Sequence, residues 1–262
     1  MALTIDFQGK VVFITGGISG IGLGISRRFV EAGAEIIVCS ERNVEDVLVK
    51  EFIVEMESLN AKYSYFEFDV TDNSKRHDFY MLLALKYKKI DVFISNAGKN
   101  VFKGVDECSE SDWDFNFNLN LESHWQLAKL IKPLLQESPS PVVLMMASNH
   151  AYSTLKGCFP YNVSKAAMLS IIQSIAIEWA PKIRVLGIAP GFIETEGNQS
   201  WFDSFEDPIA AKAETINLHL VQRIGTIEEI GAWCVFLSSE YAGFASGTTY
   251  LVDGGRSALM QD

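Results

Sequence analysis

The sequence lacks the segments that place a chain in or across a membrane. No apolar run reaches the roughly 18 residues that a spanning helix needs, and residues 1–9 do not follow the basic and then apolar order of a secretory signal peptide. No linker rich in Pro, Gly or Ser, no internal repeat and no low-complexity tract divides the chain. These absences predict a single domain over residues 1–262, with a cytoplasmic location and no membrane partner.

The chain also has few residues of the kinds that bind metals. It contains four cysteines and four histidines, and no two cysteines form a CxxC pair. The cysteines, which all lie in or beside apolar stretches, are Cys39, Cys108, Cys158 and Cys234. The histidines are equally scattered, so the sequence predicts unpaired thiols and no metal site.

Negative charge exceeds positive charge. The 22 basic and 33 acidic residues give 22 minus 33, or −11, and the acidic residues form no tail. A chain of this charge repels polyanions, so nucleic acid is not an expected partner. The 48% hydrophobic and 21% charged content is typical of a globular protein with a substantial core.

Short apolar runs alternate with longer segments of helical periodicity. Nearly continuous apolar strands that alternate with helices are typical of a parallel sheet with helices on both faces. Strands are expected at residues 10–15, 35–40, 62–68, 90–95, 141–147, 183–189 and 249–252, and helices at 21–32, 44–58, 74–86, 112–135, 161–180 and from the capping box at 226–229. The predicted fold class is α/β, a single-domain Rossmann fold with a doubly wound parallel sheet of about seven strands.

Residues 192–220 interrupt this alternation. The segment contains Trp201, Phe202 and Phe205 among several acidic residues. In an open parallel sheet, ligands bind beyond the carboxyl ends of the strands, where an insertion can cover them. We therefore expect a substrate lid at about 192–220, with a segment that only packs against the domain as the alternative.

A glycine-rich segment follows the first expected strand. Gly16, Gly17, Gly20 and Gly22 lie between this strand and the first expected helix. Glycines let the backbone turn sharply and approach a ligand closely, while a helix N-terminus offers free N–H groups to a pyrophosphate. The pattern predicts a nucleotide-binding loop.

Tyr161 and Lys165 are four residues apart on an expected helix, so their side chains project from one face. A fixed ammonium beside a phenol favours the phenolate, so we expect the pKa of Tyr161 to lie below its ordinary value of about 10. Such a tyrosine can act as a general acid or base. Ser148 ends an expected strand, where its hydroxyl can donate to a carbonyl oxygen near this pair.

Together these motifs resemble those of the short-chain dehydrogenase/reductase family, and the resemblance spans essentially the whole chain. Residues 15–22 resemble its TGxxxGxG loop, Asn96-Ala97-Gly98 its NAG motif, Tyr161 with Lys165 its YxxxK motif, and residues 253–255 its C-terminal signature. Ser148 stands thirteen positions before Tyr161, as the catalytic serine of the family usually does. Asn120, seven positions after Trp113, matches the helix asparagine that completes the catalytic tetrad.

The resemblance implies a role for each of the four catalytic residues. Tyr161 would exchange a proton with the substrate oxygen, and Ser148 would orient and polarise that oxygen. Lys165 would lower the pKa of the tyrosine and bind the nicotinamide ribose, and Asn120 would hold a water that relays protons from Lys165. The cofactor-binding residues that the resemblance implies are Gly16, Ile18, Ser19, Gly20, Ile21, Ser40, Arg42, Asp69, Val70, Asn96, Ala97, Gly98, Tyr161, Lys165, Pro190, Gly191, Ile193 and Thr195.

The residues after the second expected strand leave the choice between NAD and NADP open. NAD-dependent members of the family usually carry an acid at the position of Ser40, whereas NADP-dependent members often carry an arginine next to it. Arg42 favours a 2′-phosphate, but Glu41 opposes one. Ser19 stands in a loop where NADP-dependent members often have a basic residue.

The residues near Ser148 favour a polar substrate, such as a sugar or polyol. His150 stands where sugar-oxidising members such as glucose dehydrogenase also carry a histidine, and Asn149, Lys99 and Asn100 add hydrogen-bond donors. Trp201 and its aromatic neighbours would equally suit a lid over a more apolar ketone.

The resemblance implies an NAD(P)-dependent oxidoreductase that interconverts a secondary alcohol and a ketone in a small-molecule substrate. A dehydratase or epimerase of the same fold usually has a longer chain. A non-catalytic nucleotide-sensing module would be expected to have lost Ser148, Tyr161 or Lys165, and all three are present. The family also implies a homotetramer, assembled through the helices expected at 112–135 and 161–180.

Overall fold

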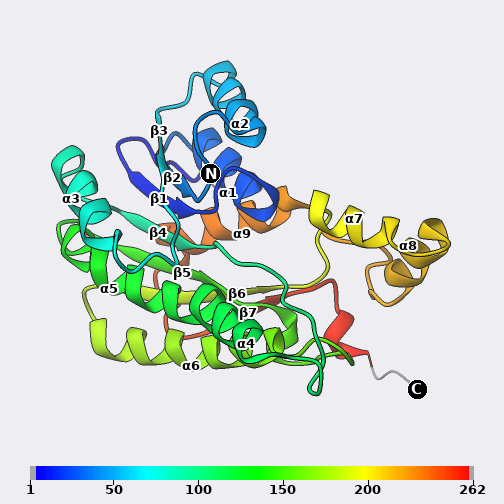
Figure 1. Ribbon diagram of the computed structural model, residues 1–262. Coiled ribbons are helices and arrows are strands. Elements are labelled where there is room, and N and C mark those ends of the chain that lie inside the picture. Colours follow the sequence, from blue (N-terminus) through cyan, green and yellow to red (C-terminus); the bar gives the residue numbers. More distant parts are fainter. Residues whose placement is uncertain (1–3, 260–262) are drawn as a thin grey trace.

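The computed structural model describes residues 4–259 and shows helices on both faces of a parallel sheet (Figure 1). Within these residues the sheet has seven strands in the order β3-β2-β1-β4-β5-β6-β7. The strands are β1 (Val11–Thr15), β2 (Glu35–Ser40), β3 (Tyr63–Glu67), β4 (Val92–Ser95), β5 (Val142–Met146), β6 (Arg184–Pro190) and β7 (Thr249–Val252). The predicted fold class is confirmed.

The helices occupy most of the chain between the strands. The α-helices are α1 (Gly20–Glu31), α2 (Val47–Ser58), α3 (Arg76–Lys86), α4 (Glu110–Phe117), α5 (Ser123–Gln136), α6 (Tyr161–Trp179), α7 (Glu196–Asp203), α8 (Pro208–Asn217) and α9 (Ile227–Ser238). A π-helix, η1 (Asn118–Glu122), and the 3-10 turns η2 (Asn149–Ala151), η3 (Glu240–Ala242) and η4 (Arg256–Ala258) complete the described elements. In residues 4–259, no helix is both long and apolar enough to cross a bilayer.

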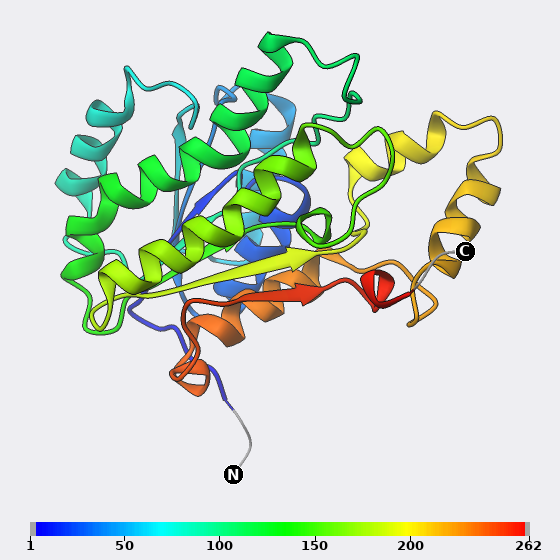
Figure 2. The same ribbon diagram turned by 90° about the horizontal axis from the view of Figure 1, so that it is seen from below.

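Two apolar cores lie on opposite faces of the sheet. Successive strand residues point to opposite faces, so Val12 and Ile14 of β1 enter the core that contains side chains of α1, α2 and α9. Phe13 enters the other core, which contains side chains of α3, α5 and α6. Both faces are covered, which explains the almost continuous apolar runs of the strands. Figure 2 shows β6 and β7 side by side at one edge of the sheet.

The strand order reverses beside β1, which pairs with β2 on one side and β4 on the other. Ile14 is in register with Val38 of β2 and with Ile94 of β4, so these strands end at the same edge of the sheet. In doubly wound sheets, ligands bind outside the carboxyl ends of the strands at such a point. The topology therefore predicts a ligand site at this edge of the sheet, beside the glycine-rich loop.

The single helix expected at 112–135 is wrong in detail. A capping box starts α4 earlier, at Glu110, because the Ser109 hydroxyl accepts from Asp112 N over 3.1 Å and the Asp112 carboxylate accepts from Ser109 N over 3.2 Å. The α-helix then gives way to η1, with its wider i to i+5 bonding, before α5 begins. Asn120 lies in the middle of η1.

The segment expected to form a lid holds two short helices, α7 and α8, which project to one side of the sheet layers (Figure 1). Thr195 caps α7 by accepting from Asn198 N over 3.2 Å. The Trp201 ring packs edge-on against Phe205, with ring centroids 4.7 Å apart, and lies 5.6 Å from Phe192. That this segment covers a substrate stays a prediction.

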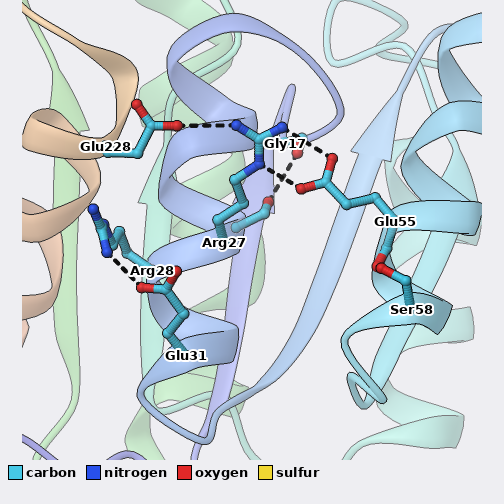
Figure 3. Close-up of polar contacts among 8 residues, drawn as sticks. Gly17, Arg27, Arg28, Glu31, Glu55, Ser58 and Glu228 are labelled. Carbon is cyan, nitrogen blue, oxygen red and sulfur yellow. Dashed lines mark hydrogen bonds and ion pairs between the residues drawn. The ribbon is translucent and has the colours of Figure 1, made fainter.

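Arg27 joins α1 to the helices on either side of it (Figure 3). Its guanidinium binds Glu55 of α2 through two nitrogens and Glu228 of α9 through a third, over 2.9 Å. These three side chains are each about two-thirds buried. The neighbouring pair Arg28–Glu31 stays within α1 and is more exposed. Arg27 therefore holds together the three helices that form one face of the domain.

Candidate active site

The glycine-rich loop is packed so closely that side chains cannot be accommodated. Gly16 has a φ of +64°, and its N–H donates to Cys39 O over 2.8 Å. A Cβ at Gly22 would lie 2.0 Å from the Gly16 carbonyl oxygen, so the loop lies directly on the first turn of α1. Ser19 precedes this helix without a side-chain cap, which leaves the first N–H groups of α1 to other acceptors. Such a loop fits a dinucleotide pyrophosphate.

The Asn96–Gly98 motif connects the ends of β1 and β4. Thr15 Oγ1 accepts from Asn96 N over 2.9 Å and from Ala97 N over 3.0 Å. A Cβ at Gly98 would lie 2.9 Å from Asn120 Oδ1 and 3.8 Å from Lys165 Nζ. The end of β4 therefore lies directly against two of the predicted catalytic residues.

The end of β2 carries a chain of polar contacts. Ser40 Oγ lies 2.8 Å from the hydroxyl of Tyr65, which in turn donates to the Arg42 carbonyl. The Arg42 guanidinium binds Asp46 Oδ2 over 2.7 Å and lies 4.0 Å from Glu41 Oε1. Sequence reasoning identified Ser40, Arg42 and Glu41 but missed Asp46, which lies four positions after Arg42 and caps α2.

The other predicted cofactor residues lie at further strand ends. Asp69 follows β3, where its Oδ1 accepts from the N–H and the hydroxyl of Thr71. Val70 is buried next to it, as are Ile18 in the glycine loop and Ile193 after β6, whereas Ile21 is half-buried. Pro190 ends β6, and Gly191 N donates to Val252 O over 3.0 Å.

Two loops that are far apart in the sequence meet at the start of α1. A Cβ at Gly20 would lie 3.6 Å from Thr195 Cγ2, in ordinary van der Waals contact. Thr195 also starts α7, so the glycine loop adjoins the base of the insertion. This brings together two residues, Gly20 and Thr195, that the family resemblance assigned to cofactor binding.

The four predicted catalytic residues are all buried, with 0% of Asn120, 6% of Ser148, 8% of Tyr161 and 3% of Lys165 exposed. Lys165 Nζ donates to Met146 O over 2.8 Å and lies 5.7 Å from the centroid of the Tyr161 ring. Ser148 Oγ accepts from His150 N over 3.2 Å at the start of η2. The structure therefore brings these residues together where β5 ends and α6 begins.

The expectation of a lowered tyrosine pKa is wrong for the protein alone. Burial raises the pKa of Tyr161 to about 12, and the Ser148 hydroxyl offsets only part of that rise. Burial also lowers the pKa of Lys165 to about 7, so near neutral pH this side chain is a cation only in part. The i, i+4 spacing predicts proximity correctly, but the loss of hydration on burial sets the direction of both pKa shifts.

Asn120 is held by the backbone of the Asn96–Gly98 loop and by a second asparagine. Its Oδ1 accepts from Lys99 N over 3.0 Å, and its Nδ2 donates to Lys99 O and to Asn116 Oδ1, both over 2.9 Å. The fully buried Asn116 donates to Pro160 O over 3.2 Å, one residue before Tyr161. Sequence reasoning missed Asn116, although its i, i+4 spacing from Asn120 was a usable signal.

His124 lies four positions after Asn120, at the same spacing that separates Asn116 from Asn120. Its Nδ1 lies 2.8 Å from Ser95 Oγ, and only 1% of the residue is exposed. Burial, together with the charge of Lys165, lowers the pKa of His124 well below its ordinary value, so the ring is neutral. Nothing in the sequence distinguishes this histidine from the other three.

A pocket of about 210 Å³ opens beside η2. Its lining residues are Asn149, His150, Ser153, Thr154, Leu155, Arg256, Ser257 and Leu259. The His150 ring lies 5.9 Å from the Tyr161 ring, and the Phe102 ring contacts both of them. Through His150, one wall of the pocket thus contacts the predicted catalytic residue Tyr161.

The structure places the predicted substrate residues in two groups. Asn149 and His150 line the pocket, whereas Lys99, Asn100 and Trp201 do not. Lys99 and Asn100 are exposed after β4, and 42% of Trp201 is exposed on α7. Arg256 lines the pocket but was missed, because the sequence indicated only that it follows the C-terminal Asp-Gly-Gly motif.

Taken together, the doubly wound sheet, the glycine cradle and the buried Ser148–Tyr161–Lys165 group define a Rossmann-fold oxidoreductase of the NAD(P)-dependent class. Over residues 4–259, the side chains of His, Cys, Asp and Glu form no group of three or more that could hold a metal ion.

Comparisons with known proteins agree with this class. A family model described as enoyl-(acyl carrier protein) reductase matches residues 16–257. The curated dehydrogenase/reductase SDR family member 4 of Homo sapiens is 32% identical over 259 residues, which are 96% of this chain and 88% of that protein. The chain belongs to the short-chain dehydrogenase/reductase family, and it is an oxidoreductase that acts on CH–OH groups.

Solved structures show the same fold. Aldohexose dehydrogenase from Thermoplasma acidophilum, without ligand, is 28% identical, with a TM-score of 0.86 over 99% of this chain and 97% of that one. The RhlG protein of Pseudomonas aeruginosa in complex with NADP is 22% identical, with a TM-score of 0.89 over 98% of this chain and 100% of that one. At that identity, the second structure shows likeness of fold alone.

Proposed function

We propose that the enzyme interconverts a secondary alcohol and a ketone in a polar small molecule, with Tyr161 as the proton donor or acceptor. The observation that carries the proposal is that buried Lys165 lies close to the ring of buried Tyr161. Its Nζ also lies beside Gly98, in the loop that follows β4. A catalytic acid or base must be held within reach of the proton that it transfers, and burial fixes these side chains in place.

Each residue in the group has a distinct part in this proposal. Ser148 would donate to the substrate oxygen and orient it, because its hydroxyl lies at the end of β5 next to the phenol. Tyr161 holds its proton at neutral pH, which is the form that reduction of a ketone needs. Oxidation of an alcohol needs the phenolate, which the charged form of Lys165 would stabilise. A bound nicotinamide supplies or accepts the hydride.

Asn120 and Asn116 would hold the proton path in place. Both side chains are fully buried, and together they link the Lys99 backbone to the residue before Tyr161. A water held by Asn120 and reached by Lys165 would carry protons away from the phenol, as the family resemblance implies. Removal of either amide would then slow proton exchange.

A polar substrate is supported by the pocket beside η2. Six of its lining residues offer hydrogen bonds from their side chains: Asn149, His150, Ser153, Thr154, Arg256 and Ser257. Aldohexose dehydrogenase, at 28% identity, is named for a polyhydroxylated substrate. A more apolar ketone would suit the aromatic cluster on α7, but Trp201 does not line the pocket.

The choice between NAD and NADP would depend on how strongly Arg42 is held by its neighbours. Two acids surround the guanidinium, Asp46 at 2.7 Å and Glu41 at 4.0 Å. A 2′-phosphate would have to draw Arg42 away from Asp46, whereas the free hydroxyl of NAD makes no such demand. The balance of these charges would therefore set the preference.

Three further properties complete the proposal. Residues 192–220 would close over the substrate, because α7 starts at Thr195 beside the glycine loop. A homotetramer would form through α4, α5 and α6, whose outer surface leaves 41% of Trp125 and 78% of Ile177 exposed. The enzyme would work in the cytoplasm.

The decisive experiment follows the absorbance of NADH and NADPH with a panel of sugars, polyols and ketones, alongside calorimetric titration of each nucleotide. We expect one nucleotide to bind and at least one polar alcohol to be oxidised. Nucleotide binding without any turnover would favour a non-catalytic sensing module. Failure to bind either nucleotide would contradict the proposal altogether.

A further inference from the structure

Arg256 is a half-buried cation next to the catalytic site. It begins η4, directly after the Asp253-Gly-Gly motif, and lines the pocket beside η2. Among residues 4–259, no carboxylate oxygen lies within 4.0 Å of its guanidinium, and no side chain or carbonyl accepts a hydrogen bond from it. A guanidinium removed partly from water normally has an acidic or carbonyl partner. Arg256 has five N–H donors and faces the pocket instead.

The nearest acid is already used by the backbone. Asp253 accepts from Gly255 N over 3.0 Å through Oδ1 and from Ser257 N over 2.8 Å through Oδ2. These bonds shape the turn that presents Arg256, so the carboxylate fixes the position of the guanidinium without pairing with it. The pKa of Arg256 is lowered, because burial outweighs the attraction of Asp253.

The pocket is positive, although the whole chain carries a net charge of −11. His150 lines the same pocket, and burial and the charge of Arg256 lower its pKa. The charge of Arg256 also contributes to a lowered pKa of the buried His219. Cys158 lies near enough for Arg256 to oppose the burial that raises the pKa of its thiol. An anion in this pocket would meet a cation and neutral donors.

The pocket adjoins the catalytic phenol through His150. His150 lies in the pocket wall, with its ring centroid 5.9 Å from that of Tyr161, and Ser148 immediately precedes η2. Ser148 and Tyr161 are not themselves among the lining residues. A volume of about 210 Å³ holds a molecule of a few carbons. A ligand anchored at Arg256 would therefore have to extend alongside His150 to bring a carbon to Ser148 and Tyr161.

We propose that the substrate is a small hydroxy acid or the corresponding oxo acid, whose carboxylate binds Arg256 while its hydroxyl or carbonyl oxygen meets Ser148 and Tyr161. This inference rests on the proposed oxidoreductase function and narrows its substrate class. A planar guanidinium matches a carboxylate with two parallel hydrogen bonds, which fixes both the position and the orientation of the substrate. His150 and Thr154 would contact the carbons and hydroxyls between the two ends.

The test compares 2-, 3- and 4-hydroxy acids of four to six carbons with their neutral primary amides. Values of kcat/KM are measured for wild type, Arg256→Gln, Arg256→Lys and, as a control, Arg28→Gln, which removes a cation that pairs with Glu31 on α1 and does not line the pocket. We expect wild type to prefer the acids. The ratio of acid to amide kcat/KM should fall about 10- to 100-fold in Arg256→Gln, recover in part in Arg256→Lys and stay unchanged in Arg28→Gln.

Calorimetry with succinate, which has the carboxylate but no hydroxyl to oxidise, separates binding from turnover. Succinate should bind wild type and Tyr161→Phe but not Arg256→Gln. Amides used as well as acids by wild type, or an unchanged ratio in Arg256→Gln, would overturn the inference and leave the oxidoreductase function standing. Succinate binding that depends on Arg256, without oxidation of any alcohol, would support the anion site and contradict the proposed function.

Discussion

Lys165 Nζ donates a hydrogen bond to the carbonyl oxygen of Met146 over 2.8 Å. This bond ties the first turn of α6 to the last residue of β5, and it fixes the amine near the Tyr161 ring. A neutral amine can still donate this hydrogen bond, as an ammonium can, because both forms carry N–H groups. The contact therefore positions Lys165 but does not preserve its charge, and burial lowers its pKa to about 7.

The first prediction concerns the pH dependence of stability without nucleotide. Between about pH 7 and the ordinary lysine value of 10.5, the unfolded chain holds a proton on Lys165 that the folded protein has lost. Stability should therefore rise from about pH 7 to about pH 8.5, by up to about 1.4 kcal/mol per pH unit. Burial raises the pKa values of the Cys39, Cys158 and Cys234 thiols, which act in the opposite direction above about pH 9. The raised pKa of Tyr161 does the same above about pH 10.

Urea unfolding at a series of pH values measures this slope. Lys165→Met should remove the rise, whereas Lys182→Met, which removes an amine that donates to Ser138 O over 2.8 Å, should keep it. A wild type whose stability does not change from about pH 7 to 8.5 would contradict the assignment.

The second prediction concerns the catalytic phenol. Tyr161→Phe removes the acid or base but keeps the ring that packs against Phe102 and His150. We expect kcat to fall about 100- to 10,000-fold, with the nucleotide dissociation constant changed less than about three-fold. Steady-state kinetics and calorimetric titration give the two values. Unchanged turnover would remove Tyr161 from its role.

The third prediction concerns nucleotide preference. Asp46→Asn should release Arg42 while the new amide oxygen still caps α2, as Asp46 Oδ1 now does by accepting from Leu48 N over 2.9 Å. The ratio of kcat/KM with NADPH to that with NADH should rise about 5- to 10-fold. Arg42→Gln should lower the same ratio. A ratio unaffected by both changes would place the 2′-position away from Arg42.

The fourth prediction concerns the glycine loop. Gly22→Ala would put a methyl group 2.0 Å from the Gly16 carbonyl oxygen, so the loop must move away from α1. We expect the nucleotide dissociation constant to rise at least about ten-fold, by calorimetry, because the loop no longer approaches the pyrophosphate. Gly197→Ala is the matched control, since its Cβ meets nothing within 4 Å.

The fifth prediction concerns the network around Arg27. Arg27→Ala leaves Glu55 and Glu228 without their shared partner and should lower the free energy of unfolding by about 1–2 kcal/mol. Arg28→Ala, which breaks a more exposed pair within one helix, should lower it by less than about 0.5 kcal/mol. Urea unfolding measures both changes, and equal losses would mean that Arg27 does not join the three helices in solution.

Local sequence patterns predicted most of the fold correctly, because they follow from local periodicity. The apolar run that includes Val12, Phe13 and Ile14 predicts a strand buried on both faces, and helices do cover both faces of the sheet. The helix expected at 112–135 was the exception. A π-helical segment at Asn118–Glu122 keeps the apolar pattern of an α-helix while it changes the bonding, so periodicity alone does not reveal it.

The sequence by itself determined the class of protein, since the spacing of Tyr161 and Lys165 and the glycines of the first loop are local features. Only the tertiary structure decided what depends on burial and on distant neighbours. Burial, and not the neighbouring lysine, sets the pKa of Tyr161. Arg256 and His150, more than a hundred positions apart in the sequence, meet in one pocket. Hydration and long-range contacts are properties of the packed chain, and no short stretch of residues contains them.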